Sequence, residues 1–249
     1  MSKKTVEGLL ILIVFATLWV PFGQTDFLIT HWMKVGSMML PFIIFIAVAF
    51  QTPKQTISIG GPKAVALALL AAYILHQHEE HWIDIFGNVY AFQGSINALV
   101  ASISTPPPGQ TGPLTAEAIF VINTSLVWLV GLIAIWQAPE RRFPSLALAA
   151  IVLVNALVHI AGSIVTVSYN PGLLTSILVF LPIAFWAYLR LAGKRNLVLL
   201  SLAWAVLAHI IMGLGMMAST WWGLIAPLGY YFVLVVWSLV PLAVRFNER

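Results

Sequence analysis

Long apolar runs dominate this sequence and restrict the folds that it can adopt. A helix rises 1.5 Å per residue, so about 20 residues, with a range near 17–25, cross the hydrocarbon core of a bilayer. We therefore predict an all-α fold, a polytopic transmembrane helical bundle that forms one integral membrane domain over residues 1–249. About eight helices are expected, near residues 7–22, 35–51, 64–82, 114–136, 145–168, 172–190, 196–218 and 222–244.

The composition agrees with this class and excludes several others. Apolar residues make up 61% of the chain and charged residues 8%, whereas soluble domains contain about 25% charged residues. The absence of cysteine excludes disulfides, thiolate metal sites, iron–sulfur clusters and cysteine nucleophiles. Any metal must therefore be bound by nitrogen and oxygen atoms. The basic residues lie between apolar runs, which disfavours nucleic-acid binding.

Lysine and arginine are distributed very unevenly between the two ends of the predicted helices. If the N-terminus is cytoplasmic, Lys34 is the one basic residue outside, and the positive-inside rule is satisfied. We therefore expect both termini in the cytoplasm. The residues placed inside are Lys3, Lys4, Lys54, Lys63, Arg141, Arg142, Arg190, Lys194, Arg195, Arg245 and Arg249.

The connection over residues 83–113 is longer than the others and partly apolar, and it ends near three consecutive prolines. Connections of this length are uncommon in compact domains unless they are functional. We expect an outer lid or a re-entrant segment here, and a passive surface loop is the alternative.

A polar cluster, His76-Gln77-His78-Glu79-Glu80-His81, ends the third apolar run. An acidic residue at membrane depth costs roughly 2.5–3.5 kcal/mol to insert, so such a cluster indicates function. At about 100° per helical residue, Glu79 and Glu80 lie about 60° and 40° to either side of His76. These three side chains share one face, which suits a metal ion or a proton relay.

Two further histidines are predicted to lie at the same depth. His76, His159 and His209 each follow their helix start by about 12–14 residues, or roughly 18–21 Å. Asn123 reaches a similar level from the opposite direction, and Asn155 lies one turn from His159. The three histidines and Asn123 are therefore expected to form one polar layer in the outer half of the membrane, with Asn155 about one turn deeper.

We interpret this layer as a metal site. His76, Glu80, His159 and His209 are the predicted ligands, and Glu79 is either another ligand or the general base. Asn123 and Asn155 would orient a ligand or the substrate during catalysis. Imidazole and carboxylate without thiolate suit zinc, which we favour, and iron as the second choice.

The sequence His76-Gln77-His78-Glu79-Glu80, with Asn155, His159 and the later His209, resembles the HXXEE-motif family of bacterial membrane proteins. The resemblance covers polar positions of the third, fifth and seventh predicted helices, so the first two helices are possible additions to a shared core. It implies a membrane enzyme in the bacterial cytoplasmic membrane, and it indicates no particular reaction.

The leading functional hypothesis is a metal-dependent membrane enzyme that acts on an apolar or lipid-like substrate, with hydrolysis favoured. The first alternative is a non-haem iron oxidoreductase at the same site, which would need a redox partner because the chain has no cysteine or nucleotide motif. The second alternative is a metal- or proton-coupled transporter that uses the histidines and glutamates as a relay. The third is a structural protein whose polar network only fixes helix packing.

Overall fold

The computed structural model describes residues 1–19, 26–50, 58–105, 107–109, 112–138 and 140–244, and nine helices account for nearly all regular structure in these residues. Three of the helices contain a π-helical segment, labelled η. The elements are α1 (Lys3–Trp19), α2 (Asp26–Ala49), α3 (Pro62–His81), α4 (Ala91–Ile103), α5–η1–α6 (Ala116–Ile122, Asn123–Leu129, Val130–Gln137), α7 (Phe143–Thr166), α8–η2–α9 (Leu173–Thr175, Ser176–Phe180, Leu181–Leu191), α10–η3 (Arg195–Met216, Met217–Trp221) and α11 (Pro227–Ala243). The predicted all-α fold is confirmed.

Among the described residues, five helices are long and apolar enough to cross a membrane, which fits a membrane protein. They are Asp26–Ala49, Ala116–Gln137, Phe143–Thr166, Leu173–Leu191 and Arg195–Trp221. Helices α1 and α11 have 17 residues each, and α3 ends in the polar cluster. The total of eight spans therefore stays a prediction.

The helix boundaries agree with most of the apolar runs, and the largest difference is at α2. This helix begins at Asp26, nine residues before the predicted start at 35. Its first turns contain His31 and Lys34. Because these residues are polar, the apolar run in the sequence begins only at residue 35. Residues 20–22 and 51 of the predicted spans, and Lys54, Arg245 and Arg249, lie outside the described residues.

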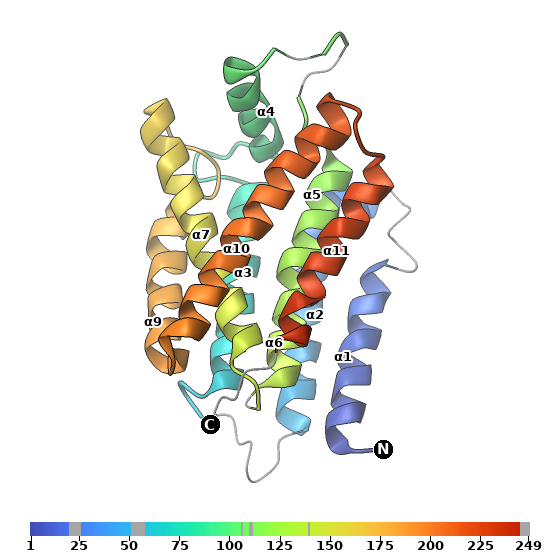
Figure 1. Ribbon diagram of the computed structural model, residues 1–249, viewed down its shortest axis with the longest axis vertical. Coiled ribbons are helices and arrows are strands. Elements are labelled where there is room, and N and C mark those ends of the chain that lie inside the picture. The colour runs from blue at the N-terminus through green and yellow to red at the C-terminus, as the bar shows by residue number, and fades with distance from the viewer. Residues whose placement is uncertain (20–25, 51–57, 106, 110–111, 139, 245–249) are drawn as a thin grey trace.

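Helix α3 lies inside the bundle (Figure 1). It packs against α2, α4, α6, α7 and the α8–η2–α9 helix. Most of its side chains are buried, including His76, Gln77, Glu79, Glu80 and His81. Because protein surrounds α3, its ionisable groups meet polar side chains of neighbouring helices instead of lipid.

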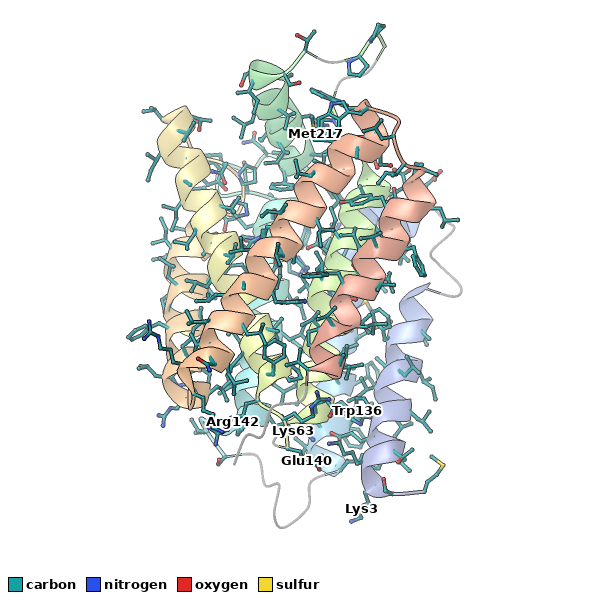
Figure 2. The ribbon with its side chains drawn as sticks, viewed as in Figure 1. Lys3, Lys63, Trp136, Glu140, Arg142 and Met217 are labelled. Carbon is teal, nitrogen blue, oxygen red and sulfur yellow. The ribbon has the colours of Figure 1, made fainter. Side chains whose placement is uncertain are left out.

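Charged side chains gather at one end of the bundle, as Figure 2 shows for Lys3, Lys63, Glu140 and Arg142. Helix α1 begins and helix α11 ends at this same end (Figure 1). This arrangement matches the predicted clustering of basic residues, and the side of the membrane on which the cluster lies stays a prediction.

Specific polar contacts hold the charged end together. Glu7 of α1 and Lys63 of α3 form an ion pair in which each side chain is only 4% exposed. Arg141 donates a hydrogen bond to the carbonyl of Leu242, 2.9 Å away, and another to Val244 at the end of α11. A cation there satisfies carbonyl groups that a helix C-terminus leaves without partners.

The segment over residues 83–113 contains helix α4 at the opposite end of the bundle (Figure 1). Asn97 of α4 accepts a hydrogen bond from the Leu114 amide at 2.9 Å and donates one to the Leu114 carbonyl at 3.0 Å. Gln93 donates to the same carbonyl. These contacts attach α4 to the start of α5, so part of this connection is helical and anchored.

The buried ion pair generates a stability prediction. Replacement Glu7→Ala leaves the Lys63 ammonium buried without this partner, and we expect a loss of about 3–5 kcal/mol. The double replacement Glu7→Leu and Lys63→Met should restore stability close to the wild type, because two apolar side chains need no charge compensation. Thermal unfolding in detergent measures both. A double variant as unstable as Glu7→Ala would contradict this account.

Candidate metal site

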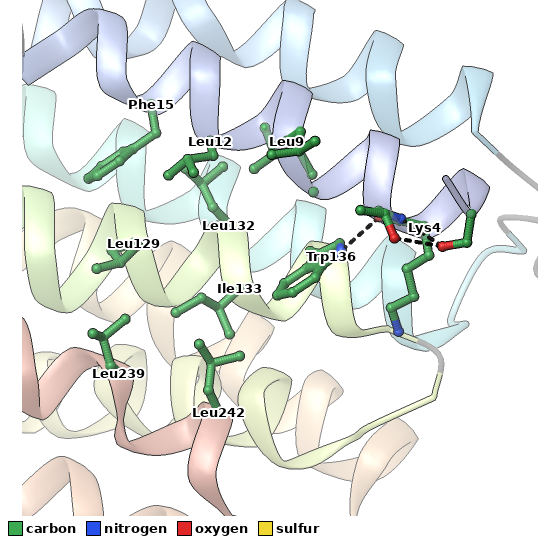
Figure 3. A pocket seen from close by; sticks show the side chains of 14 residues that line it. Lys4, Leu9, Leu12, Phe15, Leu129, Leu132, Ile133, Trp136, Leu239 and Leu242 are labelled. Atoms are coloured by element: carbon green, nitrogen blue, oxygen red, sulfur yellow. Dashed lines mark hydrogen bonds between the residues drawn. The ribbon is translucent and has the colours of Figure 1, made fainter.

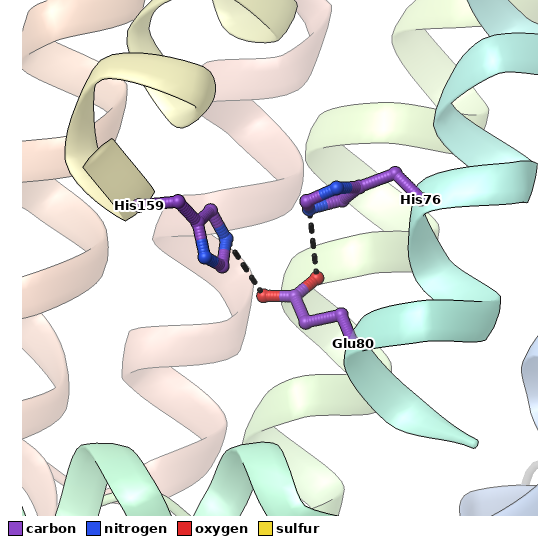
Figure 4. A group of neighbouring side chains, drawn as sticks. All are labelled: His76, Glu80 and His159. Carbon is purple, nitrogen blue, oxygen red and sulfur yellow. Dashed lines mark ion pairs between the residues drawn. The ribbon is translucent and has the colours of Figure 1, made fainter. Parts of the chain in front are cut away.

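His76 and Glu80 of α3 and His159 of α7 form a compact buried group (Figure 4). One potential ligand atom from each residue lies within 4.8 Å of the other two. The Nε2 atom of His76 is 3.5 Å from Oε2 of Glu80, and Nε2 of His159 is 3.5 Å from Oε1. Each oxygen of the carboxylate therefore faces a different imidazole.

A hydrogen bond to Thr175 sets the tautomer of His76. The Thr175 hydroxyl donates its one proton to Oε2 of Glu79 at 2.5 Å. It therefore accepts the hydrogen bond from Nδ1 of His76, at 2.8 Å. A neutral imidazole has one N–H, so Nε2 of His76 carries the lone pair that points toward Glu80.

Asn170 sets the tautomer of His159 in the same way. Its Nδ2 group donates to the His159 carbonyl at 2.9 Å and to Oγ of Ser163 at 2.6 Å. These two donations identify the other amide atom as oxygen, which accepts from Nδ1 of His159 at 2.7 Å. In the neutral form of His159, the Nε2 atom therefore carries the lone pair, and this atom faces Glu80.

In this arrangement the surrounding protein groups leave the Nε2 atom of His76 without a hydrogen-bond partner. Two nitrogen lone pairs face a carboxylate that is 5% exposed, and Nε2 of His76 has no hydrogen-bond partner. A buried polar atom without a partner is costly. A cation between these atoms, either a metal ion or a shared proton, would remove the repulsion.

His81 is a third imidazole at Glu80, although it is not among the three residues that helical periodicity places on one face. Its Nε2 atom is 3.0 Å from Oε2 of Glu80 and 3.3 Å from Nδ2 of Asn123. The shorter contact fits an N–H that donates to the carboxylate. Asn123 also accepts from Gln77 at 3.1 Å. His81 and the predicted residue Asn123 thus belong to the polar network that holds Glu80.

Glu79 points away from the group of three and toward the start of α8. Its Oε1 atom accepts from the Tyr169 hydroxyl at 3.0 Å and the Leu174 amide at 3.1 Å. Its Oε2 atom accepts from the amide and the hydroxyl of Thr175. The carboxylate therefore caps the helix that begins at Leu173, where a negative charge is favourable.

Tyr169, which lies in the loop between α7 and α8, is held as a hydrogen-bond donor. Burial raises the pKa of its phenol, and the negative charge of Glu79 beside it raises the pKa further. The phenol therefore stays protonated at neutral pH. Phe86 packs edge-on against the Tyr169 ring, 5.0 Å between centroids, so the loop that follows α3 contacts this tyrosine.

Apolar rings enclose the three candidate ligands. Phe180 packs on His76 with 4.2 Å between ring centroids, and the rings of His76 and His159 meet edge to face at 4.9 Å. Phe92, in the first turn of α4, lies 4.9 Å from His81 and 5.9 Å from His159. Helix α4 thus covers the site, as a lid would, and its role as a lid stays a prediction.

His209 and Asn155 lie outside the group of three. Nδ1 of His209 donates to the Ala205 carbonyl at 2.8 Å, which leaves its Nε2 atom basic. The potential metal-binding group found among the described residues does not include His209. The Oδ1 atom of Asn155 is buried without a hydrogen-bond partner. Their predicted roles as ligand and catalytic residue stay predictions.

Gly172 is required where the loop passes the two imidazoles. Its φ is +96°, and a Cβ atom there would lie 2.7 Å from Cε1 of His159 and 2.8 Å from Cε1 of His76. Cβ atoms in proteins essentially never come this close to another heavy atom, so any side chain at position 172 would displace the two histidines. The sequence offered only Asn170-Pro171-Gly172, a turn signal, as a hint of this contact.

Gly172→Ala should therefore disrupt the site. Gly87→Ala is a matched control, because φ is +82° there and a Cβ would contact nothing within 4 Å. The control should cost about 1–2 kcal/mol through backbone strain alone. Gly172→Ala should cost more and should also weaken metal binding, as measured by thermal unfolding and metal titration. Equal effects of the two replacements would show that the histidines tolerate the added Cβ.

Comparison with known proteins finds a family that part of the chain resembles, but it gives no activity. Residues 67–187, nearly half of the chain, match the family described as "Protein of unknown function with HXXEE motif". Searches of curated proteins and of solved structures found no match. The matched region includes His76, Glu80 and His159, and also the supporting residues Asn170 and Thr175. The match to the HXXEE-motif family, which the motif predicted, therefore runs from α3 to α9.

Proposed function

We propose that His76, Glu80 and His159 bind one divalent metal ion inside the membrane, and that the chain is a metal-dependent enzyme for an apolar or lipid-like substrate. The observation that carries this proposal is the pair of Nε2 lone pairs directed at one buried carboxylate. Hydrogen bonds from Nδ1 of ligating histidines to neighbouring groups are a common feature of metal sites.

Two imidazoles and one carboxylate are a donor set that supports catalysis. Catalytic zinc sites have three protein ligands and keep one position for water or substrate, whereas structural sites use four. A divalent ion held here would polarise a substrate carbonyl and lower the pKa of a bound water toward about 7. Zinc and hydrolysis remain our first choice on this donor set.

Hydrolysis also needs a proton acceptor, and the geometry favours His209 over Glu79. Four hydrogen-bond donors already occupy the two oxygens of the Glu79 carboxylate. His209 has a basic Nε2 atom and is not fully buried. We propose that Glu79 is a positioning residue that fixes Thr175, and through it His76, and that His209 accepts the proton.

The iron alternative is retained because two histidines and one carboxylate are also the ligands of non-haem iron oxygenases. An iron enzyme would need an external reductant, since the chain has no cysteine. Metal analysis separates the two, because zinc directs substrate screens to lipid esters and amides and iron directs them to oxygen consumption. Metal uptake by vesicles that depends on Glu80 would instead favour the transporter.

Metal content tests the ligand assignment. His76→Ala, Glu80→Gln and His159→Ala should each lower metal content of the purified protein at least tenfold, while His78→Ala, on the same helix, should not. Thr175→Val should weaken metal binding by about 10–100-fold, the usual cost of losing a group that orients a ligand. A metal-free wild type, or normal content in all three ligand variants, would overturn the proposal.

His209→Ala separates two roles in the same experiment. If His209 accepts a proton, the variant keeps its metal and loses turnover. If His209 is a fourth ligand, the variant loses metal as the other ligand variants do. In either case the protein should remain helical and membrane-bound, which circular dichroism and membrane fractionation measure.

We further propose that the charged end of the bundle is cytoplasmic and that the helices lie in the bacterial cytoplasmic membrane. The natural lack of cysteine makes this testable with single-cysteine variants. Ser2→Cys lies at the charged end, and Thr105→Cys follows α4 at the other. In intact cells a membrane-impermeant maleimide should label Thr105→Cys alone. Labelling of Ser2→Cys alone would reverse the assigned orientation.

A further inference from the structure

A second site lies on a part of the bundle that shares no residue with the metal site. It is a cavity of about 520 Å³ between α1, α11 and the helix that contains η1 and α6. Figure 3 shows α6 between the other two helices, with leucine, isoleucine and phenylalanine side chains directed into the space. The apolar lining consists of Leu9, Ile11, Leu12, Phe15, Leu129, Leu132, Ile133, Trp136, Leu239 and Leu242.

The cavity is open to the surroundings of the bundle along its length. Leu9, Leu12 and Leu239 line it and are 43%, 54% and 40% exposed. For helices in a membrane, those surroundings are lipid hydrocarbon. An apolar space of this kind does not hold ordered water, and the side chains around an empty space lack dispersion contacts. A hydrocarbon chain would supply them.

One end of the cavity is polar and lies at the charged end of the bundle. Ser2, Lys4 and Thr5 line this end. The Lys4 ammonium pairs with Glu140, and the Lys4 carbonyl accepts a hydrogen bond from Nε1 of Trp136 at 3.0 Å. The pair is partly exposed, since the side chains of Lys4 and Glu140 are 28% and 49% exposed. A ligand with an anionic head can therefore reach the ammonium.

The polar end and the apolar body of the cavity together favour one class of ligand. The cavity combines a cationic, donor-rich end at the membrane surface with an apolar body that follows α1 into the membrane. We propose that it binds one acyl chain of an anionic phospholipid, with the lipid phosphate at Lys4. This binding is independent of the proposed metal site and needs no reaction.

Native mass spectrometry can test the proposal with the full-length protein. The detergent-purified chain is mixed with equal amounts of phosphatidylglycerol and phosphatidylcholine that have identical acyl chains. We expect retention of phosphatidylglycerol to exceed that of phosphatidylcholine by about fivefold, the factor expected for one lysine near an anionic headgroup. Equal retention of both lipids, or no retention, would overturn the proposal.

Two variants of the ion pair separate headgroup binding from a structural role. Lys4→Gln should abolish the preference for phosphatidylglycerol. Glu140→Gln removes the competing carboxylate and should increase the preference, although it breaks the same ion pair. Lys3→Gln is the neighbouring control and should leave the preference unchanged, because Lys3 does not line the cavity. Equal losses in Lys4→Gln and Glu140→Gln would reject headgroup binding.

Two tryptophan variants test the position of the acyl chain. Leu12→Trp should fill the cavity and lower retention of both lipids, whereas Leu178→Trp, at an exposed leucine of η2, should not. Equal retention in the two variants would place the lipid elsewhere. If Leu12→Trp does not fold, the opposite responses of the two ion-pair variants decide the proposal.

Discussion

The interaction on which this structure depends is the contact of the buried Glu80 carboxylate with three imidazoles. A carboxylate inside a membrane is expensive unless a partner compensates its charge. Here His81 contacts one oxygen of the carboxylate at 3.0 Å, and the cation proposed between Glu80, His76 and His159 would balance the remaining charge. Helix α3 accordingly lies inside the bundle and packs against α7.

Hydrogen bonds from His76 and His159 to uncharged side chains determine which nitrogen of each imidazole faces Glu80. Thr175 and Asn170 bind the Nδ1 atoms of the two histidines, so both Nε2 atoms face the carboxylate. Both supporting residues lie on the stretch from the end of α7 to α8, and Glu79 holds that stretch by capping α8. The segment from the end of α7 to α8, held by the Glu79 carboxylate, thus determines which nitrogen of each neutral imidazole carries the lone pair.

The two glutamates of the motif have different environments although they are neighbours in sequence. Glu80 faces imidazoles, and Glu79 faces amide and hydroxyl donors at a helix start. Adjacent helical residues point about 100° apart, so α3 contacts α7 with one carboxylate and α8 with the other. This division explains how one motif both forms a site and fixes the helix that supports it.

The sequence by itself determined the all-helical fold and the positions of most helices, because apolar runs of bilayer length permit little else. It also identified His76, Glu80 and His159, since ionisable residues at one depth in a membrane have few structural uses. Only the tertiary structure showed that Glu79 caps α8, that His81 contacts Glu80, and that Gly172, Thr175 and Asn170 shape the site. These contacts join residues up to 99 positions apart, and helical periodicity describes only the faces of one helix. The position of each helix against its neighbours decides which of those faces meet.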